Sequence, residues 1–143
     1  MDITSPAFLK NGPIPPQYGC KGRNINPPLE ISGIPPEAKS LVLIMHDPDA
    51  PKGDFVHWVC YDMELVENLE AGAASGRQGI NSSGKLGYMG PCPPSGTHHY
   101  HFKIYALNTK LNLPSGASRQ IVESAMIGHV VESSELVGTF SVN

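Results

Sequence analysis

Residues 40–45 read SLVLIM, a continuous apolar run between a proline-rich turn and the turn segment Asp47-Pro48-Asp49-Ala50-Pro51. A short apolar run bounded by turn residues is typical of a strand buried on both faces. The next segment, FVHWVCY at residues 55–61, is rich in aromatic and β-branched residues, which favour a pleated sheet. The sequence therefore predicts two neighbouring strands at the centre of a sheet.

Further elements follow toward the C-terminus. Residues 100–106 (YHFKIYA) alternate, which predicts a third strand with Tyr100, Phe102 and Ile104 on one face and His101, Lys103 and Tyr105 on the other. Apolar residues then recur at three and four positions from Ile121 to Val130, after Ser118 as a candidate N-cap. This spacing predicts one helix of about three turns, and residues 136–142 predict a closing strand.

The composition agrees with a compact, mostly β protein. Glycines (15) and prolines (14) form about a fifth of the 143 residues, which disfavours long helices, and the seven prolines within residues 13–36 predict short edge strands. Hydrophobic residues make up 40% and charged residues 16%, so a disordered chain is excluded. Residues 1–143 are expected to form a single domain. The glycine-rich residues 70–97 are expected to form a long loop, of the kind that serves binding or is mobile.

Charge and cysteine usage limit the function classes. The net charge of −3 lacks the basic excess that nucleic-acid binding needs. The chain has no apolar run of about 18 residues and no basic leader segment, so we expect a cytoplasmic protein that does not span a membrane. Cys20, Cys60 and Cys92 are odd in number and widely spaced, which predicts reduced thiols rather than disulfides or a zinc site.

Three groups of residues could carry chemistry. Asp47-Pro48-Asp49-Ala50-Pro51 forms a stiff turn after the first central strand, and His57 lies in the second. Residues 87–102 combine three glycines, three prolines and a histidine-rich strand entry, in which His98 and Tyr100 share one face by the period of two. His99 and His101 should then face the opposite, solvated side.

Each group also has a simpler interpretation. The aspartates could form an Asx-type turn that satisfies backbone N–H groups, and His57 could be a buried core histidine. A metal site of His57, His98 and Asp47 or Asp49 matches no known ligand spacing. Cys92 could be a nucleophile with a histidine base, although no third residue can be assigned to such a triad.

The segments Asp47-Pro-Asp-Ala-Pro51, His57-Trp58 and Gly87-Tyr-x-Gly-Pro-x-Pro-Pro-x-Gly-x-His98-x-Tyr100-x-Phe102 resemble the two signature blocks of the phosphatidylethanolamine-binding protein family, also called the Raf kinase inhibitor family. The similarity extends over almost the whole chain and is greatest to the bacterial and archaeal branch. It implies a Greek-key β-sandwich with one main helix, long pocket-forming loops and a small anion-accepting pocket. Carried over position by position, the implied ligand-binding residues are Asp47, Asp49, His57, Gly90, Pro93, His98 and Tyr100.

The resemblance and the residues together predict a non-enzymatic binding protein with no cofactor and no metal. Its ligand would be a small phosphorylated or zwitterionic group, and binding it could regulate a signalling partner. An alternative is an inhibitor of a kinase or protease that docks through the loop at residues 91–96. A hydrolase that uses Asp47, Asp49 and His57 as acid and base groups is a further alternative. The resemblance to prokaryotic members also suggests a homodimer.

Overall fold

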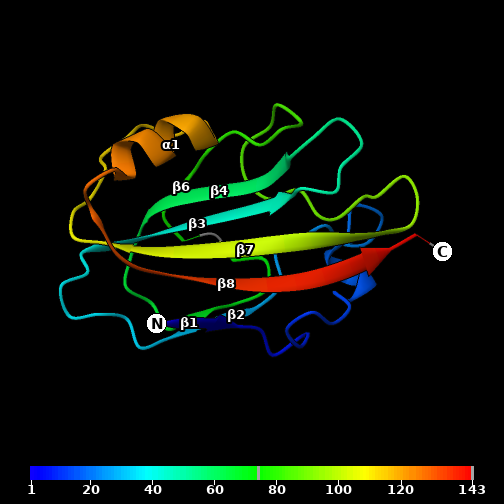
Figure 1. Cartoon of the computed structure of the whole chain (residues 1–143), viewed down its shortest axis with the longest axis horizontal. Helices are drawn as coiled ribbons and strands as arrows, with labels where there is room; N and C mark the ends of the chain where they lie inside the picture. Colours follow the sequence, from blue (N-terminus) through cyan, green and yellow to red (C-terminus); the bar gives the residue numbers. More distant parts are fainter. Residues whose placement is uncertain (74, 143) are drawn as a thin grey trace.

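The structure is a computed structural model that describes residues 1–73 and 75–142. Within these residues the protein is mostly β, with two antiparallel sheets and one α-helix, which confirms the predicted class (Figure 1). The Greek-key connection stays a prediction. The elements are β1 (Asp2–Thr4), η1 (Pro16–Tyr18), β2 (Leu29–Ser32), β3 (Ser40–Asp47), β4 (Phe55–Met63), β5 (Asn68–Leu69), β6 (Arg77–Gln78), β7 (Thr97–Leu107), α1 (Arg119–Met126) and β8 (Val130–Ser141).

Strand β3 is the middle of the larger sheet, whose order is β6-β4-β3-β7-β8. Every residue of β3 is buried, because both faces of this sheet are covered. Leu41, Leu43 and Met45 belong to the core on one face, and Val42 and Ile44 belong to the core on the other. The predicted pair of central strands is therefore confirmed.

The smaller sheet, β1-β2-β5, covers one face of the larger one (Figure 1). Its apolar residues Ile3, Leu29, Ile31 and Leu69 share a core with the larger sheet. These strands are only two to four residues long, in agreement with the short strands predicted for the proline-rich first forty residues.

Helix α1 covers part of the opposite face, where Val122 and Met126 are buried. The Ser118 hydroxyl accepts a hydrogen bond from the Ile121 N–H (3.2 Å), which confirms the predicted N-cap. The predicted length is wrong, because the helix ends at Met126. Gly128 then takes a left-handed conformation (φ 83°), and Val130 begins β8.

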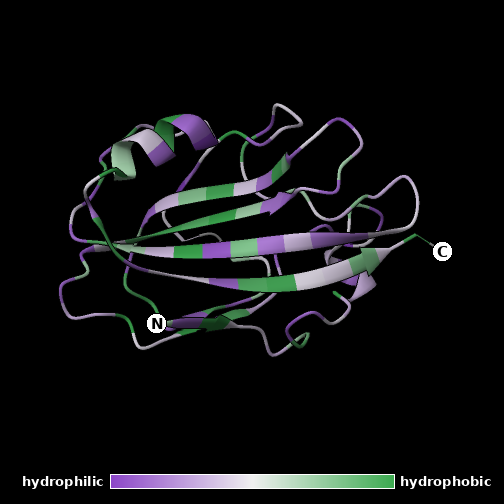
Figure 2. Cartoon of the chain, in the orientation of Figure 1, coloured by the Kyte–Doolittle hydropathy of each residue, from purple (hydrophilic) through white to green (hydrophobic). Residues whose placement is uncertain are grey.

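Strand β7 alternates as predicted, with Tyr100, Phe102 and Ile104 fully buried and the intervening side chains half-buried. Figure 2 shows hydrophobic and hydrophilic bands along the strands of this sheet. It begins at Thr97, so His98 is held by the sheet rather than by the preceding loop. Residues 70–97 have little regular structure apart from β6 and one bridge between Ile80 and Leu86. Part of this predicted loop, Ala74, lies outside the described residues.

The prediction of three reduced cysteines is wrong for two of them. Cys20 and Cys92 form a disulfide with a Cα–Cα distance of 5.4 Å, and Cys60 is a free, buried cysteine. The three cysteines are therefore one disulfide-bonded pair and one cysteine in the core. Burial raises the pKa of the Cys60 thiol to about 12, so this cysteine is an inert part of the core. Among the described residues, no helix is long and apolar enough to cross a membrane.

Candidate functional site

A β-bulge determines the direction of the His57 side chain. Met45 pairs with Trp58 and His46 pairs with Val56, so His57 is an extra residue in β4 with no partner of its own. By simple alternation His57 would share a face with Val59, which packs toward α1. The bulge instead turns His57 toward the end of the sheet where Tyr100 lies, and the two ring centroids are 5.2 Å apart.

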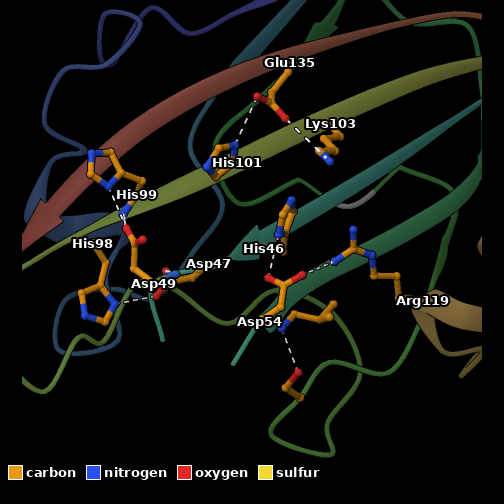
Figure 3. Close-up of polar contacts among 12 residues, drawn as sticks. His46, Asp47, Asp49, Asp54, His98, His99, His101, Lys103, Arg119 and Glu135 are labelled. Atoms are coloured by element: carbon orange, nitrogen blue, oxygen red, sulfur yellow. Dashed lines mark hydrogen bonds and ion pairs between the residues drawn. The ribbon is translucent and has the colours of Figure 1, made fainter. Parts of the chain in front are cut away.

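A buried carboxylate holds the second histidine. His98 Nδ1 lies 2.6 Å from Asp47 Oδ2, with only 8% of His98 and 3% of Asp47 exposed (Figure 3). The other carboxylate oxygen of Asp47 accepts the Asp49 N–H at 2.8 Å. The Asx-type turn predicted as the simpler interpretation is therefore present, and the same aspartate also fixes the His98 ring.

These side chains surround a small cavity, which we call the pocket, with a volume of about 120 Å³. It lies at the end of the larger sheet, between the β3–β4 turn and the loop that precedes β7. Its lining residues are Asp47, Ala50, Pro51, Phe55, His57, Met89, Cys92, Pro93, Pro94, His98 and Tyr100. Most of the lining is apolar, so the few polar atoms act in surroundings that water solvates poorly.

The structure brings together five of the seven residues that the resemblance implied, namely Asp47, His57, Pro93, His98 and Tyr100. Asp49 and Gly90 are not among the lining residues. Sequence reasoning missed the other lining residues, which are Ala50, Pro51, Phe55, Met89, Cys92 and Pro94. For Phe55 a signal was available, because it precedes His57 by two positions in the same strand.

Asp49 contacts His99 outside the pocket. Its carboxylate accepts hydrogen bonds from His99 Nδ1 (2.7 Å) and from the His99 backbone N–H (2.9 Å), and both side chains are about half exposed. The side-chain hydrogen bond from His99 lowers the pKa of Asp49. The expected solvated position of His99 is correct, but the side chain also holds the β3–β4 turn against β7.

Hydrogen bonds define which ring nitrogens can meet a ligand. His57 Nδ1 lies 2.6 Å from the Met89 carbonyl oxygen, which can only accept, so Nδ1 carries the proton. His98 Nδ1 likewise donates to the Asp47 carboxylate. Each neutral ring therefore keeps Nε2 as its free nitrogen, and this atom becomes a donor only when the ring is protonated.

Burial changes the acid–base behaviour of the pocket. It lowers the pKa of His57, although the Met89 carbonyl and the charge of Asp47 act in the opposite direction. Burial also raises the pKa of Tyr100, and the charge of Asp47 raises it further. The Tyr100 hydroxyl is buried without a hydrogen-bond partner among the described residues, so the pocket contains an unsatisfied polar group.

Gly90 supports the pocket from behind. Its N–H donates to Asn24 Oδ1 (2.7 Å), so this N–H is not free to bind an anion. A Cβ at this position would overlap the Tyr18 carbonyl oxygen. The glycine is needed because the pocket loop approaches the backbone of residues 18–24 so closely.

Gly90→Ala is expected to lower the free energy of unfolding by about 1–3 kcal/mol, because the Tyr18 backbone must move. Urea denaturation of the purified variant measures this change. Ser95→Ala, in the exposed part of the same loop, is the control and should stay within about 0.5 kcal/mol of the wild type. Equal stability of the two variants would contradict the close approach.

A second polar cluster lies beside the pocket, on the face of the larger sheet that carries α1 (Figure 3). His46 Nδ1 contacts Asp54 Oδ1 at 2.7 Å, and Arg119 contacts the other Asp54 oxygen at 2.8 Å. The His46 ring stacks on His101 with centroids 5.2 Å apart. We call these four residues the His46 cluster. Sequence reasoning did not single out His46.

Burial lowers the pKa of His46, and the positive charges of Arg119 and Lys103 lower it further, whereas Asp54 acts in the opposite direction. Its Nε2 is buried without a hydrogen-bond partner among the described residues. Burial alone would raise the pKa of Asp54, but His46 and Arg119 together lower it. Burial therefore disfavours the charged form of His46.

We expect His46→Asn to weaken the pH dependence of stability between pH 7.5 and 5. The folded pKa of His46 lies below about 6.5, the value expected in the unfolded chain, so the unfolded chain binds the proton first as pH falls. The stabilising contribution is complete above that value and is lost below it. Asparagine keeps a donor toward Asp54 but does not titrate.

Urea denaturation at several pH values measures this effect. The same substitution at His129, which lies outside the His46 cluster, is the control. Parallel pH profiles for the wild type and His46→Asn would show that His46 does not couple folding to protonation.

Two other interpretations of these residues can be compared with the geometry. Among residues 1–73 and 75–142, no group of three or more His, Cys, Asp or Glu side chains is arranged to hold a metal ion. Cys92 is bonded to Cys20, so the interpretation of Cys92 as a free nucleophile is wrong.

Comparison with known proteins identifies relatives along the whole chain. The sequence profile of the family described as Phosphatidylethanolamine-binding protein matches residues 4–141. A UPF0098 protein of Methanothermobacter thermautotrophicus is 48% identical, with 98% of each chain covered. A UPF0098 protein of Pyrococcus horikoshii is also 48% identical, over 95% of this chain and 74% of that protein.

Two solved structures share the fold. A putative phosphatidylethanolamine-binding protein homologue from Chlamydia trachomatis superposes with a TM-score of 0.96 at 42% identity, covering 99% of this chain and 97% of that one. Escherichia coli YbcL, described as a member of the mammalian family, superposes with a TM-score of 0.91 at 28% identity, covering 99% and 98%.

Proposed function

Because the chain belongs to the phosphatidylethanolamine-binding protein family, we propose that it is a non-enzymatic binding protein whose pocket takes a small phosphorylated or zwitterionic group. The observation that carries the proposal is the buried Tyr100 hydroxyl, which has no partner within the described residues and lies among lining residues that include His57 and His98. A ligand oxygen would satisfy this hydroxyl and remove the cost of leaving it unpaired.

The charges of the pocket side chains favour a zwitterionic ligand, or an oxyanion that carries a proton, over a fully deprotonated anion. Asp47 is a buried carboxylate, and the neutral forms of His57 and His98 offer lone pairs rather than donors. An oxyanion therefore binds well only when at least one Nε2 carries a proton. Alternatively, an ammonium group on the ligand could donate to these nitrogens or to Asp47.

Several features support recognition rather than turnover. Cys92 is in a disulfide, and the pKa of Tyr100 is raised, so neither is an activated nucleophile. For the hydrolase alternative, turnover of p-nitrophenyl phosphate that disappears in His57→Ala would overturn the non-enzymatic proposal.

The regulatory role of the protein is part of the proposal. Cys92, Pro94, Ser95 and Gly96 are exposed beside the pocket, which supports docking of a partner such as a kinase or protease on this loop. Stoichiometric inhibition of a panel of such enzymes tests that role. The cytoplasmic location and the homodimer are also kept as proposals, tested by cell fractionation and by light scattering.

The central test is a thermal-shift titration with phosphate, phosphoethanolamine, phosphoserine and phosphotyrosine at pH 6. A ligand at about 100 times its Kd should stabilise the folded state by about 2.7 kcal/mol. Tyr100→Phe, which removes only the hydroxyl, should weaken binding roughly tenfold or more. The matched control is Tyr105→Phe, the same change on the opposite face of β7.

The pH dependence separates the protein's protonation from that of the ligand. Sulfate stays a dianion between pH 5.5 and 8.5, so any change in its affinity reports the histidines. We expect tighter sulfate binding at the lower pH, because protonation of a pocket histidine turns its Nε2 into a donor. Burial, which lowers the pKa of His57, opposes this protonation and limits the gain. Equal sulfate affinity at both pH values would show that protonation of the histidines does not contribute to binding.

A further inference from the structure

The wall of the pocket that contains Cys92 and Pro93 has a cavity on each side. On its other side is a larger groove of about 320 Å³, to which Cys92 and Pro93 also contribute, together with Pro16, Lys21 and Phe140. Packed side chains therefore do not fill the space behind this wall. Pro93 is buried, whereas Cys92 is exposed, so the bonds that Cys92 makes contribute to the position of this wall.

Hydrogen bonds anchor the loop on both sides of the wall but leave a gap of three residues after Cys92. The Met89 N–H donates to the His57 carbonyl (2.9 Å), and the Pro91 carbonyl accepts from the Cys20 N–H (3.0 Å). Beyond Cys92, no hydrogen bond of the described residues reaches residues 93–95. The next one joins Val142 N–H to the Gly96 carbonyl (3.1 Å). Two of the three intervening residues are prolines, which have no N–H to donate.

The Cys20–Cys92 disulfide is the covalent bond that ties this wall to a distant segment of the protein. It joins the wall to the segment after η1, which lines the rear groove. Cys92 is exposed and Cys20 is half-buried, so small thiols can reach the bond. Exposed disulfides are more readily reduced than buried ones.

We propose that the Cys20–Cys92 disulfide is a redox latch that holds the Cys92–Pro93 wall in the shape that binds a ligand, and that its reduction by a thiol reductant weakens binding. This rests on the proposed function of the pocket. A dithiol breaks the Sγ–Sγ bond, supplying two electrons and two protons, and is itself oxidised to a cyclic disulfide. The two cysteines become thiols, and the wall between the pocket and the rear groove loses its tether.

The test compares phosphate affinity of the oxidised protein and of protein reduced with dithiothreitol. Thiol counting under denaturing conditions should rise from one to three as the single disulfide opens. We expect about tenfold weaker phosphate binding after reduction, because a mobile wall must be ordered at the moment of binding. Reoxidation should restore the affinity, whereas equal affinity of the two forms would overturn the latch.

Variants separate the latch from other effects of the reductant. The double variant Cys20→Ser, Cys92→Ser should bind phosphate as weakly as the reduced protein and ignore dithiothreitol. Cys60→Ser removes only the buried core thiol and should keep the full response. A response to dithiothreitol that persists in the double variant would overturn the proposal.

A measurement without ligand distinguishes failure of the latch from failure of the proposed function. Amide hydrogen exchange of Cys20, whose N–H donates to the Pro91 carbonyl, and of Val142, whose N–H donates to the Gly96 carbonyl, should become faster on reduction. Exchange in β3 should stay slow, which shows that the protein is folded. If neither form binds phosphate but this exchange accelerates, the latch stands and the phosphate proposal fails. Unchanged exchange in fully reduced protein would overturn the latch.

Discussion

Asp47→Ala is expected to lower the free energy of unfolding by about 3–5 kcal/mol, because two donors in and beside the buried site lose their carboxylate acceptor. Asp47 and His98 are both more than nine-tenths buried, and their atoms approach to 2.6 Å. Alanine would leave the His98 Nδ1–H and the Asp49 N–H without acceptors. Urea denaturation at pH 7 measures the loss.

Asp49→Ala is the matched control, because the two carboxylates are two residues apart and differ mainly in exposure. The Asp49 carboxylate is 42% exposed and pairs with the exposed His99, so its removal should cost no more than about 1 kcal/mol. If both alanine variants lose the same small amount, the Asp47–His98 contact does not stabilise the fold. In a separate measurement, the phosphate affinity of Asp47→Ala shows whether binding depends on the orientation of the His98 ring.

The sequence predicted the centre of the fold because local pattern and burial agree there. An uninterrupted apolar run such as β3 can be accommodated only where both faces of a strand are covered. The alternation of β7 likewise placed His98 and Tyr100 on the buried face, since the period of two needs no tertiary information. These two residues form the most predictable part of the site.

The direction of His57 could not be worked out from alternation. The bulge in β4 depends on how this strand pairs with β3, and pairing is a property of two segments together. The same limit applies to His46, whose contact with His101 follows from the β3–β7 register. The resemblance placed His57 at the pocket, but the physical reason for its direction appears only in the paired sheet.

The distinction between Asp47 and Asp49 also required the structure. Both belong to one short motif, and either could have faced the cavity. The turn directs Asp47 toward His98 and leaves Asp49 near the surface beside His99. Cysteine spacing was equally uninformative, because 72 residues separate Cys20 from Cys92 and only the fold brings them together.

Reduction of the Cys20–Cys92 disulfide is expected to lower the free energy of unfolding by about 4 kcal/mol. The bond closes a loop with a sequence separation of 72, and the chain-entropy account gives a cost of about this size for such a loop. The corresponding fall in Tm is about 10–15 °C. Thermal and urea denaturation with and without dithiothreitol measure the change.

The loss of stability on reduction depends on the entropy of the unfolded chain, whereas the redox latch depends on the shape of the folded pocket. The two effects can therefore be measured separately by choosing the temperature. Well below the lowered Tm, the reduced protein should be folded and differ from the oxidised form mainly at residues 92–97. The double serine variant should match the reduced protein in stability, and Cys60→Ser should retain the full loss on reduction. Stability that does not change when the disulfide opens would show that hydrogen bonds such as that between the Gly90 N–H and Asn24 already hold the two segments together.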